Sequence, residues 1–158
     1  MVSRIDEKKS LVSVSKSLKI RLGKIMIIGF DPGRDKCGIA LINEDREIVF
    51  KKVVNSQSAI ATIQQTIEKY KPLTLVMGNQ TTAKEWEKKL REDINLGIVL
   101  IDEQNSSAEA RIRYWDFNPP RGLQKLIPQG LRIPPDPIDD IVAVILIERY
   151  WQKQLKMT

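Results

Sequence analysis

Histidine is absent from this 158-residue sequence, and cysteine occurs once, at Cys37. Without histidine, Ser-His-Asp and Cys-His catalysis are excluded, and so is any histidine ligand to a metal. A single cysteine cannot form an internal disulfide or a cysteine-cluster zinc site. Proton transfer and metal binding therefore fall mainly to Asp, Glu, Lys and Tyr, and oxygen ligands favour hard cations such as Mg²⁺ or Mn²⁺.

Long apolar runs are absent as well. No segment approaches the roughly 20 residues that a transmembrane helix requires, and the charged N-terminus is not followed by the uninterrupted apolar segment of a signal peptide. We therefore expect a cytoplasmic protein that does not enter a membrane, with import into an organelle left open.

Positive charge is concentrated at the N-terminus. Residues 1–24 hold seven of the 26 basic residues but two of the 20 acidic ones, so most of the net charge of +6 lies there. We expect residues 1–23 to form a basic, mostly disordered arm, which either adds contacts to phosphates or is simply solvated. Residues 24–158 have the length of a single domain.

Apolar patterning predicts five strands and four helices, joined so that three strands with short polar turns are followed by strand–helix alternation. Short turns indicate antiparallel hairpins, and helical crossovers indicate parallel strands. The sequence thus predicts an α/β fold with a mixed sheet: a three-stranded antiparallel meander plus two parallel strands, with helices on both faces. The expected strands are 24–30, 37–42, 47–54, 73–77 and 98–101; the expected helices are 58–71, 82–96, 106–117 with a capping box of Ser106 and Glu109, and 137–153 with Pro137 in its first turn.

Acidic residues follow two of the buried strands and open the last helix. Asp31 ends the first strand, and Asp102 and Glu103 follow the fifth. Asp136 and Asp139 are three residues apart, a spacing that places two side chains on one helix face. One acidic residue at a helix N-terminus is explained by capping and the helix dipole. Three in five positions, with Asp140 as the third, exceed that need.

Clustered carboxylates of this kind suit phosphodiester hydrolysis. Two divalent ions about 3.5–4 Å apart compensate the charge of the phosphate and deprotonate a water molecule. Crowded carboxylates repel one another, which favours cation binding. Arg34 and Lys36, close to Asp31, and Arg111 and Arg121, which flank the later acidic segments, are candidate phosphate-binding residues. A solvated surface explains these four cations about as well.

Three segments carry a family resemblance. Phe30–Leu41 (FDPGRDKCGIAL) resembles the first strand pair of RuvC- and YqgF-type proteins of the RNase H-like superfamily. Asp102–Ala110 (DEQNSSAEA) is similar to the YqgF segment after the fifth strand, and Pro135–Val144 (PDPIDDIVAV) to the C-terminal acidic helix of both groups. The resemblance spans about residues 24 to 151 and includes the element order.

The resemblance implies an RNase H-like fold and a Mg²⁺- or Mn²⁺-dependent nuclease that acts on branched DNA, as RuvC does, or on ribosomal RNA precursors, as YqgF does. It implies that Asp31, Glu103 and Asp139 are catalytic metal ligands, that Asp136 is a further ligand, and that Lys36 matches a YqgF lysine. RuvC works as a dimer, so a homodimer is expected on the same ground.

The sequence also departs from both groups. RuvC places its glutamate at the end of the fourth strand, where this chain has Gly78-Asn79-Gln80, and Cys37 stands where YqgF proteins commonly have arginine. One alternative is therefore a nucleic-acid-binding or assembly module that keeps the fold without cleavage. A sugar-kinase or actin-like ATPase is a weaker alternative, since such enzymes clasp nucleotide between two related domains.

Overall fold

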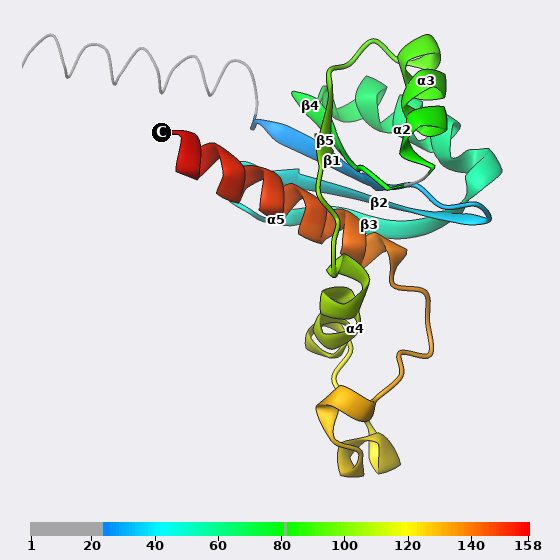
Figure 1. The fold of residues 1–158 in the computed structure, drawn as a ribbon, viewed down its shortest axis with the longest axis vertical. Helices are drawn as coiled ribbons and strands as arrows, with labels where there is room; N and C mark the ends of the chain where they lie inside the picture. Colours follow the sequence, from blue (N-terminus) through cyan, green and yellow to red (C-terminus); the bar gives the residue numbers. More distant parts are fainter. Residues whose placement is uncertain (1–23, 81) are drawn as a thin grey trace, which may run out of the picture.

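The computed structural model describes residues 24–80 and 82–158, so the arm predicted for residues 1–23 lies outside the described residues. Its centre is a five-stranded sheet with the strand order β3-β2-β1-β4-β5 (Figure 1). β1, β2 and β3 form an antiparallel meander, and β4 and β5 run parallel to β1, which confirms the predicted mixed sheet. The strands are β1 (Met26–Asp31), β2 (Lys36–Asn43), β3 (Ile48–Asn55), β4 (Thr74–Gly78) and β5 (Ile98–Ile101).

Helices cover both faces of the sheet, as expected (Figure 1). Successive side chains of β1 enter opposite cores, with Ile27 packed against the helices of one face and Ile28 against those of the other. A strand buried on both faces requires a continuous apolar run, which is the pattern from which β1 was predicted. One core is closed by α4 (Ser106–Phe117) and α5 (Asp139–Met157), and the other by α2 (Ala59–Tyr70) and α3 (Ala83–Asp93).

Helix α5 crosses the sheet at very short range. A Cβ atom on Gly29 of β1 would lie 2.2 Å from the carbonyl oxygen of Ala143, so only glycine allows this approach. Seven consecutive residues of the helix, 141–147, are buried. Because α5 lies directly on β1 and β2, its first turn comes to the edge of the sheet where β1 ends (Figure 1).

Three local predictions were wrong. The last helix begins at Asp139 and not at Pro137, because the first helical hydrogen bonds are accepted by the carbonyl of Ile138. The predicted capping box at Ser106 does not form, since Asn105, with a left-handed φ of 62°, occupies the N-cap and makes no side-chain cap bond. Helix α3 ends at Asp93 because Ile94 is extended.

Between α4 and α5 the chain forms two short 3-10 turns, η2 (Gly122–Leu126) and η3 (Gln129–Leu131), after a 3-10 turn η1 (Ser56–Ser58) earlier in the chain. The turns η2 and η3 lie beyond the end of α4, away from the sheet (Figure 1). Within the described ranges, no helix has the length and apolar character needed to cross a membrane.

Candidate active site

Asp31 is the last residue of the central strand β1, and its side chain is half-buried. Its partner across the ladder is Gly38 of β2. A Cβ atom on Gly38 would lie 1.8 Å from the carbonyl oxygen of Asp139, so the first turn of α5 is seated on the position that a side chain would occupy. Asp31 pairs with Gly38, and Gly38 has no side chain that would keep α5 away. Asp139, the first residue of α5, therefore lies next to the end of β1.

Glu103 reaches the same edge from the other side. It follows β5, yet its carboxylate lies over Gly78, the last residue of β4: a Cβ atom there would be 2.5 Å from Cδ and Oε2 of Glu103. The backbone N–H of Gln80 donates a hydrogen bond of 2.9 Å to Oε1 of Glu103. The missing side chain at Gly78 thus leaves room at the end of β4 for a carboxylate supplied by the neighbouring strand.

The electrostatics show that Glu103 and Asp139 both act on Asp31. Burial, followed by the charges of Glu103 and Asp139, raises the pKa of Asp31 to about 8. Burial is also the main reason why the pKa of Glu103 and that of Asp139 are raised. The Gln80 N–H opposes the shift at Glu103. The sequence-based grouping of Asp31, Glu103 and Asp139 at one sheet edge therefore agrees with the geometry.

Asp136 and Asp140 take other partners. The Tyr114 hydroxyl of α4 donates a hydrogen bond of 2.6 Å to Asp136, and this bond raises the pKa of the tyrosine to about 12. The predicted common helix face of Asp136 and Asp139 is wrong, because the helix starts only at Asp139. Asp140 pairs with Lys51 of β3 at 2.9 Å.

Of the predicted cations, Lys36 is the one whose charge lowers the pKa of Asp139, so it lies close to the carboxylate group. Arg34 lines a cleft of about 430 Å³ together with Lys89 of α3. Arg111 is exposed on α4. Arg121 lines a second cleft, of about 320 Å³, beside Tyr114 and Phe117. The structure thus places Lys36 near Asp139 and the three arginines on separate surfaces.

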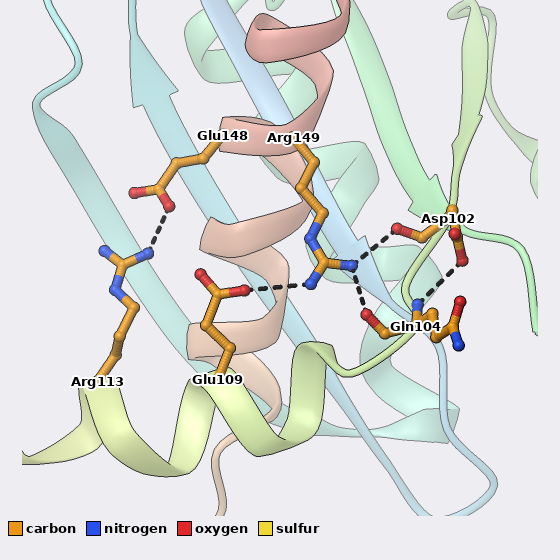
Figure 2. A network of polar contacts seen from close by, with 6 residues as sticks. All are labelled: Asp102, Gln104, Glu109, Arg113, Glu148 and Arg149. Carbon is orange, nitrogen blue, oxygen red and sulfur yellow. Dashed lines mark hydrogen bonds and ion pairs between the residues drawn. The ribbon is translucent and has the colours of Figure 1, made fainter.

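Arg149 of α5 was not predicted to contribute to the site. Its guanidinium donates hydrogen bonds to the backbone carbonyls of Asp102 and Gln104, on either side of Glu103, and to the carboxylate of Glu109 (Figure 2). Its positive charge also lowers the pKa of Glu103, against the larger effect of burial. An arginine in the polar second half of α5 carries no sequence signal for such a role, because the contact joins elements distant in the chain.

The group fits a hard divalent cation in donor type and in charge. All three side chains offer carboxylate oxygens, which Mg²⁺ and Mn²⁺ prefer. Burial and the charges of Glu103 and Asp139 raise the pKa of Asp31 to about 8, and the charge of a bound dication would offset this effect. Within residues 24–80 and 82–158, no three acidic or cysteine side chains are already arranged around a single metal position.

Comparison with known proteins gives concordant results. A family model described as RuvX, Holliday junction resolvase, matches residues 25–153. A curated protein of Buchnera aphidicola subspecies Baizongia pistaciae, named as a pre-16S rRNA nuclease, is 25% identical over 142 residues, covering 80% of this chain and 96% of that protein. The RuvC structure of Thermus thermophilus is similar in fold, with a TM-score of 0.50 and 8% identity over 84% of this chain and 97% of that chain.

Proposed function

The chain belongs to the RuvX family of Holliday junction resolvases, and from this premise we propose that it is a divalent-metal-dependent nuclease whose reaction takes place at Asp31, Glu103 and Asp139. The family and the Buchnera relative make it a nuclease that acts on nucleic acid. The observation that carries the proposed site is the convergence of three carboxylates from β1, the β5–α4 turn and α5, with the pKa of Asp31 raised to about 8.

In this proposal each carboxylate has a part. Asp31, at the centre of the edge, and Glu103 and Asp139, on either side, hold Mg²⁺ or Mn²⁺. Such an ion would activate a water molecule and neutralise charge on the scissile phosphate. Asp136 remains a predicted further ligand, and in this structure it is the acceptor of the Tyr114 hydrogen bond.

The cations around the edge supply the contacts to the substrate backbone. Lys36 lies near enough to Asp139 to meet a phosphate oxygen at the reaction centre. Arg34, Arg111 and Arg121 lie on separate surfaces, and we propose that they bind phosphates of a structured substrate. The substrate is branched DNA or a ribosomal RNA precursor, the two classes named by the family description and by the Buchnera relative.

The finer predictions on organisation are part of the same proposal. Residues 24–158 form a single domain, and the basic residues 1–23 add contacts to nucleic acid. The protein acts in the cytoplasm and forms a homodimer, as the resemblance to RuvC suggests. Analytical ultracentrifugation of the full chain and of a chain starting at Lys24 tests the dimer, and nucleic-acid affinity of the same two samples tests the arm.

A cleavage assay decides the proposed function. The purified chain is incubated with a four-way DNA junction, duplex DNA and a structured RNA precursor, each with Mg²⁺, Mn²⁺ or EDTA. We expect cleavage of the junction or of the RNA that requires metal and is lost in Asp31→Asn. Binding without cleavage of any substrate, by wild type and variant alike, would instead identify a non-catalytic binding module.

A further inference from the structure

Glu103 lies in the turn between β5 and α4. A side chain in a turn keeps a fixed position only where other contacts hold the turn itself. The residue is buried, with 5% of its surface exposed, although it follows a four-residue strand at the edge of the sheet. The turn has its own internal bonds: Gln104 N–H donates to the Asp102 side chain at 3.0 Å, and Ser106 N–H donates to the carbonyl of Glu103 at 2.9 Å. Asn105 completes it with a φ of 62°.

The outside of this turn is held by one side chain of another element. Nη1 of Arg149 lies 2.9 Å from the carbonyl oxygen of Asp102 and 2.9 Å from that of Gln104, and Nη2 lies 3.1 Å from Oε2 of Glu109 (Figure 2). The two carbonyls flank Glu103, so the guanidinium spans the residue that carries the carboxylate. A planar guanidinium can make all three bonds at once, whereas the ammonium of a lysine is a point charge without this fork.

We propose that Arg149 is a positioning residue: it holds the β5–α4 turn from outside so that Glu103 projects over Gly78 and joins Asp31 at the end of β1. The inference rests on the proposed function, since it takes Glu103 to be a ligand of the divalent ion. It also accounts for the absence of an acidic residue at the end of β4, because the turn after β5 delivers the carboxylate to that place instead.

A neighbouring ion pair provides a control that distinguishes the positioning of Glu103 by Arg149 from simple support of the two helices. Arg113 of α4 pairs with Glu148 of α5, and Arg149 of α5 pairs with Glu109 of α4, so both pairs join the same two helices (Figure 2). Their side chains are exposed to similar extents, 26% for Arg113 and 24% for Arg149. The bonds to the turn are made by Arg149, which makes Arg113→Gln a matched control for the loss of an interhelical pair.

The test compares Arg149→Gln, Arg149→Lys and Arg113→Gln. For each, cleavage rate is measured against Mg²⁺ concentration, Mn²⁺ binding is measured by calorimetry, and the thermal unfolding midpoint is recorded. We expect Arg149→Gln to weaken metal affinity about 10–100-fold, the usual cost of removing a group that orients a ligand. Arg149→Lys restores part of that loss, and Arg113→Gln changes metal affinity by less than about threefold, as for a partly exposed ion pair.

A double-mutant cycle with Glu103→Gln identifies the residue through which Arg149 acts. If Arg149 works by placing Glu103, Arg149→Gln adds little further loss of metal affinity once Glu103 has been replaced. Full additivity, or equal losses in Arg149→Gln and Arg113→Gln, would overturn the inference. A wild-type chain that binds Mn²⁺ but cleaves nothing would overturn the proposed function, while the Mn²⁺ titrations would still decide the role of Arg149.

Discussion

Charge is arranged in opposite ways at the end of β1 and along the α4–α5 contact. At the end of β1, burial together with the charges of Glu103 and Asp139 raises the pKa of Asp31 to about 8, and Lys36 lies near Asp139. Along α4 and α5, each of two glutamates has an arginine partner. Paired charges hold helices together at little cost, whereas gathered carboxylates are destabilising until a cation joins them. The acidic edge is therefore a place where the folded protein loses stability unless a cation binds.

The largest effect is expected at the centre of the acidic edge. Asp31→Asn should reduce metal-dependent cleavage by about 10²–10³-fold, the scale of loss for a group that stabilises charge in the transition state. Because burial and the charges of Glu103 and Asp139 disfavour an ionised Asp31, the neutral amide should leave the metal-free variant at least as stable as the wild type. Cleavage kinetics and denaturant unfolding in EDTA measure the two effects. An Asp31→Asn variant that is less stable than the wild type and cleaves equally well would contradict the contrast drawn between the acidic edge and the α4–α5 contact.

A methyl group at the end of β4 should disturb the edge without changing its charge. In Gly78→Ala the new Cβ would lie 2.5 Å from the Glu103 carboxylate, so the carboxylate must move. We expect a loss of metal affinity of about 10–100-fold, as for other changes that misplace a ligand. Calorimetric titration with Mn²⁺ measures this loss.

Gly97→Ala is the matched control for this substitution. A Cβ there has Thr74 Oγ1 as its nearest neighbour, at 3.7 Å, which is an ordinary contact. Metal affinity should be unchanged in this variant. If the two alanine variants behave alike, the site does not depend on the space above Gly78.

Removing the partner of a paired carboxylate should lower the stability of the protein, whereas neutralising Asp31 should not. Lys51→Gln leaves the largely buried Asp140 without its partner, and the free energy of unfolding should fall by about 1–3 kcal/mol, the cost of leaving a buried polar group unsatisfied. Lys24→Gln breaks exposed pairs with Asp45 and Glu47 and should change stability much less. Urea denaturation measures the free energy of unfolding of both variants. Equal losses would show that burial does not determine how much each ion pair contributes to stability.

The smallest effect is a pH dependence of stability without metal. The folded protein keeps a proton on Asp31 up to a pH of about 8, whereas the unfolded chain loses it near 3.8. Between these values the folded state binds more protons, so its stability falls as the pH rises. Asp31→Asn should remove this slope, so the unfolding midpoints of variant and wild type in EDTA should diverge progressively as the pH rises from 5 to 8. A wild-type slope that persists in Asp31→Asn would assign the proton to another group.

Much of the fold was predictable because its signals are local. The apolar run of β1 and the short polar turns after it specify strands and their antiparallel pairing. The position of Asp31 and of Glu103 after strands was equally visible, since parallel strands end at a common edge. The start of α5 and the N-cap of α4 were misjudged, because Ile138 and Asn105 take these positions without a side-chain cap that a sequence motif could reveal.

The different partners of the three aspartates at the start of α5 were not predictable from their residue type and spacing. Asp136, Asp139 and Asp140 have the same chemistry within five residues, yet one accepts a bond from Tyr114, one joins Asp31 and one pairs with Lys51. Each partner comes from a different element, and the seating of α5 on Gly38 decides which side chain faces which partner.

By itself the sequence excluded chemistry that needs histidine or a pair of cysteines, and it determined that several carboxylates follow buried strands. The tertiary structure decided which carboxylates meet. Two glycines, Gly38 and Gly78, let α5 and Glu103 close on the end of β1, and Arg149 holds the turn that carries Glu103. The physical reason is that electrostatic interaction depends on distance and burial, which packing between distant segments sets and residue order alone does not.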